Sequence, residues 1–265
     1  MNLLETKSLT RRFDVLTAVD HVSFAVRESE VFGLVGPNGA GKSTMIKMMT
    51  TLLRPTSGTA TICGYDIVKQ SASVRRQIGY VPQMVSADGD LTAKENLLLV
   101  ATLYDVPKAE RRERAEEALE FMNLADVADK RVRQFSGGMI RRLEIAQSML
   151  HRPKMLFLDE PTVGLDPVAR SSVWDHILEL RDRYQTTILL TTHLMDEVEN
   201  LCDRMGVMHH GKMVAVGTSA ELKTATGDPK ATLDDVFIKF AGERIDESSG
   251  FRAISRARRT ARRLG

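Results

Sequence analysis

The stretch GPNGAGKST, Gly36 to Thr44, has the residue types and spacing of a loop that binds phosphate. It fits G-x-x-x-x-G-K-[ST], in which glycines let backbone N–H groups curl around phosphate oxygens at the positive end of the next helix. Lys42 can reach the β- and γ-phosphates, and the Ser43 hydroxyl can ligate Mg²⁺. The alternative is a glycine-rich turn with no ligand, but an apolar strand before it and a helix after it favour phosphate binding. The predicted binding residues are Gly36, Pro37, Asn38, Gly39, Ala40, Gly41, Lys42, Ser43 and Thr44.

The stretch MLFLDEP, Met155 to Pro161, is an apolar strand that ends in two acids. Asp159 at the strand tip can hold the hydration shell of Mg²⁺. Glu160 beside it can accept a proton from the attacking water or orient that water. Two acids alone are also typical of a solvated strand end. Beside a phosphate loop they predict hydrolysis, and since both motifs must meet at one metal ion, the segment between them does not separate two domains.

A third motif, FSGGM, places Ser136, Gly137 and Gly138 where a helix begins. Unpaired N–H groups, a serine hydroxyl and the helix dipole would converge there and favour an anion. The alternative is that the two glycines let two helices pack closely. One phosphate loop already serves the chain, so the ligand of this second anion site needs a separate explanation.

Alternation and short apolar runs predict the strands that position these motifs. Val22, Phe24 and Val26 alternate with His21, Ser23 and Ala25, and denser apolar runs follow. The predicted strands are 22–26, 31–36, 59–64, 78–83, 155–160, 186–193 and a hairpin of 204–210 with 212–217 that turns at His210-Gly211.

Helices are predicted between these strands. One covers 45–53 and ends at Arg54-Pro55, and others cover 166–184 and 194–203. Between about Met84 and Arg152 only helices are expected, and the first of them begins with a capping box of Thr92 and Glu95. Strand–helix alternation at both ends of the chain predicts an α/β fold with a mostly parallel sheet and a helical insert.

Composition narrows the class of protein. The chain has 265 residues, 43% of them hydrophobic and 27% charged, which suits one large domain or one domain with an insertion. A net charge of +2 does not favour a dedicated nucleic-acid binder. Cys63 and Cys202 form no CxxC pair and are expected to be reduced and half-buried. The start lacks the pattern of a signal peptide, and no apolar run approaches about 18 residues, so a role at a membrane would be peripheral.

The order of the motifs resembles that of the ATP-binding subunit of an ABC transporter. The phosphate loop is followed by Gln83 in YVPQ, then FSGGM, the acid strand, GLDP (Gly164 to Pro167) and His193 in TTH. The resemblance covers about Leu3 to Gly217. It implies a P-loop ATPase cassette over 1–220, with a mixed sheet, an antiparallel β subdomain and a helical subdomain at 84–152, followed by a C-terminal extension at 221–265.

The resemblance also implies roles that the residues alone do not establish. Gln83 touches Mg²⁺ or the water and senses the membrane partner, Asp166 organises the dimer interface, and His193 contacts the γ-phosphate. Catalysis falls to Glu160, His193 and Gln83, and Mg²⁺ to Ser43, Gln83 and Asp159. Phe13 corresponds to the aromatic residue that stacks on adenine, although it could instead pack against the first strands. The residues implied to face ATP bound to a second protomer are Ser136, Gly137, Gly138 and Met139.

The residues in and around the motifs resemble those of one branch of the family. Phe135 and Met139 replace the first and last residues of the common LSGGQ, while RRLEIA, DEPTVGLDP and TTHLMDEVE resemble the branch that exports drugs, lipids or polysaccharides. The expected protein binds Mg²⁺ and ATP, pairs with a second cassette, and powers a separately encoded multi-span permease from the cytoplasmic face of the membrane. Intact motifs favour a homodimer. The alternatives are a soluble ABC ATPase without a transport role and a nucleotide switch without hydrolysis.

The end of the chain has its own pattern. TLDDVFIKFAG, 232–242, resembles the segment that ends cassettes of the export branch. The last fifteen residues, 251–265, hold six arginines and no acid. They could bind anionic lipid headgroups or an acidic loop of a membrane subunit, or form a solvated basic tail.

Overall fold

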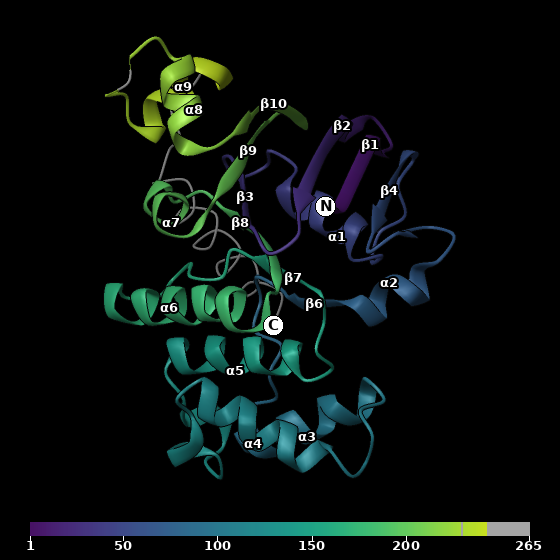
Figure 1. The fold of residues 1–265 in the computed structure, drawn as a ribbon, viewed down its shortest axis with the longest axis vertical. Helices are drawn as coiled ribbons and strands as arrows, with labels where there is room; N and C mark the ends of the chain where they lie inside the picture. The colour runs from purple at the N-terminus through teal and green to yellow at the C-terminus, as the bar shows by residue number, and fades with distance from the viewer. Residues whose placement is uncertain (229, 243–265) are drawn as a thin grey trace, which may run out of the picture.

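The computed structural model describes residues 1–228 and 230–242, so the arginine-rich stretch 251–265 lies outside the described residues. Two sheets and the helices around them make up the described chain (Figure 1). In Figure 1 the helices between the sixth and seventh strands gather at one end of the molecule, and the last two helices lie at the other.

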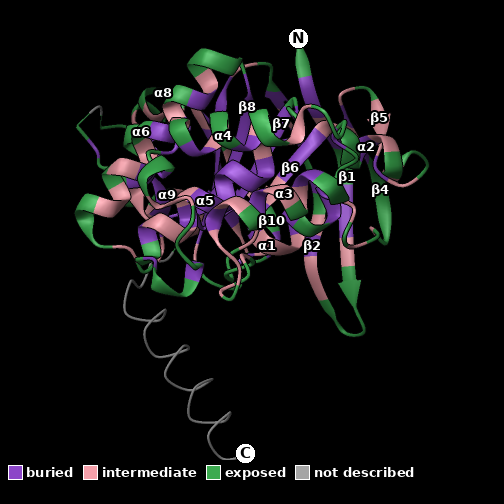
Figure 2. Ribbon diagram, turned by 90° about the horizontal axis from the view of Figure 1, so that it is seen from below, coloured by how far each residue is buried: buried purple, intermediate pink, exposed green. Residues whose placement is uncertain are grey.

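A six-stranded sheet forms the centre of the fold, in the order β10-β9-β3-β8-β7-β6. All neighbouring strands are parallel except the β9–β10 hairpin, so the prediction of a mostly parallel sheet is confirmed. Every residue of β3, β7 and β8 is buried, as expected for strands covered on both faces (Figure 2). The strands are β3 (Val31–Val35), β6 (Ile78–Val81), β7 (Met155–Asp159), β8 (Thr187–Thr192), β9 (Arg204–His209) and β10 (Lys212–Gly217).

A second, antiparallel sheet has the order β2-β1-β4-β5. Its strands are β1 (Asn2–Phe13), β2 (Leu16–Arg27), β4 (Ser57–Ile62) and β5 (Tyr65–Asp66). The sequence did not predict β1, because Leu3 and Leu4 are both buried and register shifts interrupt its pairing with β2, which breaks the alternation. The helix α2 (Ser71–Gln77), which contributes only Val74 to the core, was also missed.

The segment between β6 and β7 holds three α-helices, α3 (Ala93–Leu103), α4 (Arg111–Phe121) and α5 (Gly137–Met149). The capping box of Thr92 and Glu95 at the start of α3 is confirmed. Apolar faces of these helices share one buried cluster with β7 and β8, whose members include Leu97, Leu119, Leu143, Leu158 and Leu190. The helices are therefore packed on the sheet and not held beside it by linkers alone.

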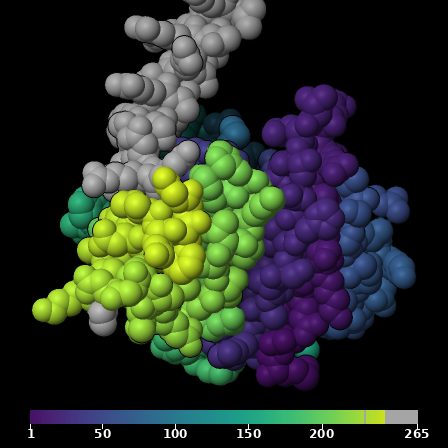
Figure 3. Space-filling view, turned by 90° about the horizontal axis from the view of Figure 1, so that it is seen from above, coloured from purple at the N-terminus to yellow at the C-terminus, as the bar shows by residue number. Residues whose placement is uncertain are grey.

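The remaining helices flank the sheet. They are α1 (Lys42–Met49), α6 (Pro167–Tyr184), α7 (Met195–Leu201), α8 (Ser219–Ala225) and α9 (Leu233–Ala241). The prediction that the first helix runs to Leu53 was wrong: Thr51 has a left-handed φ of 64°, and Leu53 N donates to Lys47 O, which turns the chain before Pro55 is reached. Seen from above, α8 and α9 lie beside the β9–β10 hairpin (Figure 3), and Leu222 and Phe237 join a cluster with Val207.

Two further expectations concern the described residues only. Within 1–228 and 230–242, no helix combines the length and apolar character needed to cross a bilayer. Cys63 and Cys202 are free thiols of intermediate exposure, as predicted.

The two glycines at the start of α5 differ in what surrounds them. A Cβ on Gly138 would lie 2.8 Å from the Cβ of Ala169 on α6, a contact that neither rigid partner can relieve. A Cβ on Gly137 would meet only the mobile Cδ2 of Leu165, at 3.2 Å. Close helix packing therefore accounts for Gly138 but not for Gly137.

We predict that Gly138→Ala lowers the free energy of unfolding by about 1–3 kcal/mol, because the added methyl overpacks the α5–α6 contact. Gly137→Ala, the matched control, should be neutral or slightly stabilising, since alanine is the better helix former. Urea unfolding of both variants measures the difference. Equal stability of the two would contradict the packing role of Gly138.

Candidate active site

The phosphate-type loop follows β3 and leads directly into α1. Gly41, the N-cap of α1, has a left-handed φ of 102°, and a Cβ there would lie 2.4 Å from Ala18 O, so only glycine fits. Met45 N donates to Gly41 O. The N–H groups of Lys42, Ser43 and Thr44 precede this first bond of the helix and are left for a ligand. The loop thus offers the donors that its sequence predicts.

Lys42 folds back over this loop. Its Nζ donates to Gly36 O at 2.7 Å and to Pro37 O at 3.1 Å, and it lies 3.6 Å from Glu160 Oε1. The side chain is 4% exposed, and burial lowers the pKa of Lys42 while the charges of Glu160 and Asp159 oppose that shift. Phosphate oxygens are acceptors like these carbonyls, so the ammonium is positioned to bind them.

Ser43 and Asp159 meet at the tip of β7. Ser43 Oγ donates to Asp159 Oδ1 at 3.1 Å, and Thr191 Oγ1 on β8 donates to the same oxygen at 2.6 Å. A hydroxyl and a carboxylate are the hard oxygen ligands that Mg²⁺ takes together with phosphate oxygens. These residues fit the metal ion that the sequence predicts.

Glu160, directly after β7, receives donors from separate parts of the chain. Gln83 Nε2 donates to Glu160 Oε2 at 2.9 Å, and His193 Nδ1 lies 3.2 Å from Oε1. The backbone of Glu160 has a left-handed φ of 49°, and its N–H donates to the O and Oγ1 of Thr191. The three residues predicted to be catalytic are thus brought together.

The charge of Glu160 follows from these contacts. Burial alone would raise the pKa of Glu160, but the hydrogen bond with His193 and the charge of Lys42 outweigh it, so the pKa is lowered. The side chain is therefore a carboxylate at neutral pH. Because its folded pKa is depressed, its contribution to stability is present above the ordinary pKa and is lost as the pH falls through the lowered value.

These residues open onto a cavity of about 480 Å³. From the predicted set, Asn38, Gly39, Gly41, Lys42, Ser43, Thr44, Gln83 and Glu160 line it. Sequence reasoning missed the other lining residues, Leu16, Thr17, Ala18, His210 and Gly211. Gly211 N donates to Ala40 O and Gly211 O accepts from Asp20 N, so the β9–β10 turn joins the loop to the second sheet. The turn itself was predicted, but no sequence signal placed it against the loop.

Phe13 lies at the tip of the β1–β2 hairpin and is not among the residues that line the cavity in the described chain. Its ring is 40% exposed, and the guanidinium of Arg11 lies 4.5 Å above the ring centroid. Adenine stacking on Phe13 stays a prediction.

The FSGGM residues form a separate surface. Ser136 Oγ accepts from Met139 N at 3.3 Å and caps α5, and both Ser136 and Gly137 are exposed. Asp166, also exposed, caps α6 by accepting from Val168 N and Ala169 N. Within the part of the chain that the structure describes, none of the residues 136–139 lines the 480 Å³ cavity.

Behind His193, a buried acid connects β8 to α6 and α7. Glu197 on α7 is fully buried, and its Oε1 accepts from Thr162 Oγ1 at 2.8 Å and from Trp174 Nε1 at 3.2 Å. Burial raises the pKa of Glu197. Glu197 also forms a side-chain hydrogen bond with Thr192, the last residue of β8 and the neighbour of His193, and nothing in the sequence indicated this network.

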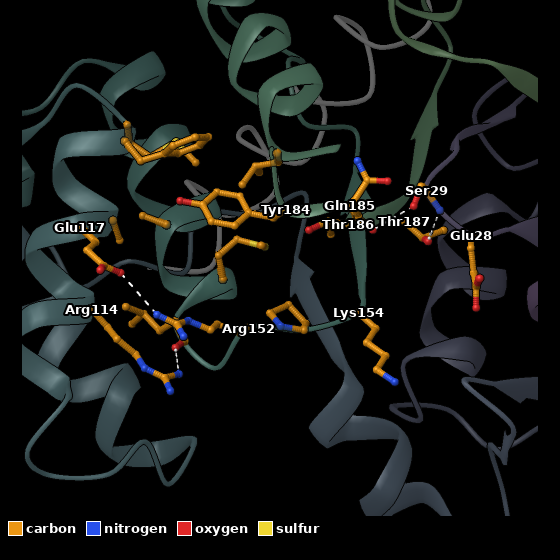
Figure 4. Close-up of a pocket in the computed structure, with 18 of the residues that line it drawn as sticks. Glu28, Ser29, Arg114, Glu117, Arg152, Lys154, Tyr184, Gln185, Thr186 and Thr187 are labelled. Carbon is orange, nitrogen blue, oxygen red and sulfur yellow. Dashed lines mark hydrogen bonds and ion pairs between the residues drawn. The ribbon is translucent and has the colours of Figure 1, made fainter. Parts of the chain in front are cut away.

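A second cavity, of about 510 Å³, lies between α4, α5 and the end of α6 (Figure 4). Its walls are mainly apolar, and Arg114, Glu117 and Tyr184 lie at its edge. It contains none of the predicted site residues. The predicted site residues that line a cavity line the one of about 480 Å³ and not this one.

The chain is similar to known proteins in sequence and in fold. Residues 19–163 match the family model described as ABC transporter. The chain is 45% identical over 224 residues to the daunorubicin/doxorubicin resistance ATP-binding protein DrrA of Streptomyces peucetius, which covers 84% of this chain and 68% of DrrA. Curated relatives compared with the chain are covered over 41% to 72% of their own length.

Two solved structures show the same architecture. One, an ATP-binding subunit of an ABC transporter, is 32% identical with a TM-score of 0.80, covering 90% of this chain and 99% of that one. The other is a dimeric, post-hydrolysis structure of the ATP-binding cassette MJ0796 bound to ADP and Pi. It is 26% identical with a TM-score of 0.73, covering 81% of this chain and 98% of that one.

We predict that Lys42→Met weakens binding of ATP by about 10- to 100-fold, the value of a charge-assisted hydrogen bond. It removes the ammonium and leaves the buried Glu160 carboxylate without the Lys42 cation beside the phosphates. Lys47→Met, on the exposed side of the same helix, is the control and should bind normally. Titration with a fluorescent ATP analogue measures both. Unchanged affinity of the Lys42 variant would exclude the loop as the phosphate site.

Proposed function

This chain belongs to the ABC transporter family of ATP-binding proteins, and we propose that it hydrolyses ATP at Glu160 to power a membrane exporter. The single observation that carries the proposal is the meeting of Gln83, Lys42 and His193 on the Glu160 carboxylate beside a cavity of about 480 Å³. Cavities of roughly 300–1,000 Å³ hold ligands of nucleotide size.

The geometry supports a simple sequence of events. The N–H groups at the start of α1 and the Lys42 ammonium bind the β- and γ-phosphates of ATP. Glu160, held as a carboxylate, orients a water and accepts its proton while the water oxygen bonds to the γ-phosphorus. The bond from that phosphorus to the bridging oxygen breaks, and ADP takes the electron pair. Mg²⁺, held by Ser43 and Asp159 with Gln83 nearby, would neutralise charge on the phosphates.

The proposal includes a homodimer with two ATP molecules between the protomers. Ser136 and Gly137 are exposed at the positive end of α5. There the γ-phosphate of an ATP bound by a second copy accepts hydrogen bonds from their N–H groups. Met139 and Asp166 would lie at the same interface. ATP then favours the closed dimer because the γ-phosphate contacts exist only in that state, and hydrolysis removes them. The dimeric state of the MJ0796 cassette supports this arrangement.

The partner in transport is a separate membrane protein. We propose a multi-span permease, bound to the chain from the cytoplasmic side, with 1–220 as the cassette and 84–152 as its helical subdomain. The name of DrrA concerns resistance to daunorubicin and doxorubicin, which supports export of a drug-like compound within the drug, lipid or polysaccharide class. Names of this kind favour a transport role over that of a soluble ABC ATPase.

We expect Glu160→Gln to slow ATP hydrolysis by about 10²- to 10⁴-fold, the usual contribution of a general base. Its amide keeps the shape of the side chain but accepts no proton, so ATP should persist and hold the dimer closed. Phosphate release and size-exclusion chromatography with ATP test both effects. Glu179→Gln, exposed on α6, is the control. Normal turnover in the Glu160 variant would refute the assigned role.

We expect Gly137→Asp to leave ATP binding by the single chain within about twofold but to abolish closure and turnover, because its carboxylate repels the γ-phosphate of the second copy. Gly137→Ala adds a side chain without charge and should keep most activity. ATP affinity and ATP-dependent dimerisation are measured for both. If Gly137→Asp loses ATP binding by the isolated chain, the surface does not act on a second molecule.

A further inference from the structure

The loop after β6 carries Gln83 and is hydrogen-bonded to side chains of α5. The side chains of Gln83, Met84, Val85 and Ser86 are exposed. An exposed loop would not by itself keep an amide within 2.9 Å of Glu160 Oε2. The position of Gln83 therefore depends on contacts of the loop backbone.

Two buried charges on α5 supply those contacts. Arg141 NH1 donates to Pro82 O at 2.8 Å, and its NH2 donates to Gln83 O at 3.1 Å. Glu144 Oε1 accepts from Ser86 N at 2.5 Å and from Ser86 Oγ at 2.9 Å. The backbone of the loop is thus bound to α5 on both sides of the Gln83 side chain. Arg141 binds the carbonyls of residues 82 and 83, and Glu144 binds Ser86.

The pair is built as a unit. Arg141 and Glu144 are 7% and 2% exposed, stand one turn apart on α5, and form an ion pair of 3.0 Å between NH1 and Oε2. A guanidinium presents two donors in a fixed fork, which suits two successive carbonyls. Two buried charges are costly unless each finds such partners. Packing of α5 alone would need only apolar side chains here, so the two buried charges point to a role in binding the loop.

The same helix begins at the FSGGM surface. Ser136 caps α5, and Arg141 follows five residues later, about 7.5 Å along the axis. Further along, Gln147 Nε2 donates to Asn96 Oδ1, which also accepts from Asp88 N. The helix α5 therefore connects two parts of the molecule. Its first turn carries the FSGGM surface, which is proposed to meet a second ATP, and its middle binds the loop that holds Gln83.

We propose that Arg141 and Glu144 are positioning residues: they clamp the 82–86 loop to α5, hold Gln83 on Glu160, and make the loop follow any movement of Ser136. The proposal rests on the proposed function, because it assigns Gln83 a role in hydrolysis. Closure of a dimer onto Ser136 and Gly137 would then move Gln83 in the chain's own site. Among the described residues, neither Arg141 nor Glu144 lines the 480 Å³ cavity.

The test compares ATPase kinetics of full-length variants. Arg141→Met combined with Glu144→Met removes both charges at once, which avoids the buried unpaired charge that a single change would leave. Its kcat should fall about 10- to 100-fold, the cost of misplacing a catalytic group by about 1 Å, while KM stays within about twofold. In a Gln83→Ala background the same double change should cause no further loss. Equal thermal unfolding midpoints establish that the fold is intact.

A matched control lies on α4. Arg114 on α4 pairs with Glu110, the N-cap of that helix, and Arg114 NH1 also donates to a backbone oxygen, that of Leu150, but within the described chain no contact joins either residue to the 82–86 loop. Replacing both by methionine should leave kcat within about twofold. A second, milder variant, Ser86→Ala, changes only an exposed side chain and should lower kcat about threefold through the lost hydroxyl bond.

The outcomes separate the inference from the function on which it rests. If Gln83→Ala lowers kcat while the Arg141/Glu144 double variant and Ser86→Ala do not, the clamp is wrong and the function stands. The clamp is equally wrong if the double change lowers kcat by the same factor with and without Gln83. If Gln83→Ala leaves kcat unchanged, the catalytic role of Gln83 fails and the clamp with it. An unfolded double variant leaves Ser86→Ala as the deciding measurement.

Discussion

The structure depends on keeping one buried carboxylate charged. Glu160 lies in a site where burial disfavours ionisation, and it stays ionised because the hydrogen bond with His193 and the charge of Lys42 lower its pKa, while Gln83 also donates to the carboxylate. Lys42, Gln83, Glu160 and His193 follow β3, β6, β7 and β8, and they converge because these strands run parallel and end at one edge of the sheet. The apolar strands, the tight loop at Gly41 and the left-handed backbone of Glu160 all serve that convergence. Losing the contact with His193 or Lys42 would raise the pKa of Glu160, since burial would then be less well opposed.

The same requirement gives the helical segment its place. Gln83 belongs to a loop that leaves the sheet and enters the helices, so its aim at Glu160 is set by how α5 packs. The buried ion pair of Arg141 and Glu144 lies where a purely apolar core would have been simpler. Close approach at Gly138 fixes α5 against α6, whose cap is Asp166. The helices are thus part of the active site although they contribute no group to its cavity wall.

Much of this could be predicted from the sequence, and the reasons for the failures are physical. Motifs with fixed spacing, such as Gly36 to Thr44, were informative because the chemistry constrains neighbouring residues. The buried strands β3, β7 and β8 were predicted because unbroken apolar runs have few other uses. The first strand was missed where register shifts break its alternation, and α1 ended early at a left-handed threonine, Thr51. Contacts between residues far apart in the chain, such as Gly211 with Ala40 or Glu144 with Ser86, leave no trace in local spacing.

One consequence of the network behind His193 is spectroscopic. Trp174 is the only tryptophan of the chain, and its indole N–H donates to Glu197, the buried acid that is also hydrogen-bonded to Thr192 at the end of β8. Fluorescence excited selectively in indole therefore reports on the surroundings of Trp174 alone. The emission of an indole depends on its hydrogen bonding and on nearby charge, so a rearrangement of the Glu197 network, which includes Thr192 next to His193, would change an optical signal. The intrinsic fluorescence of Trp174 can therefore be followed in the unmodified chain.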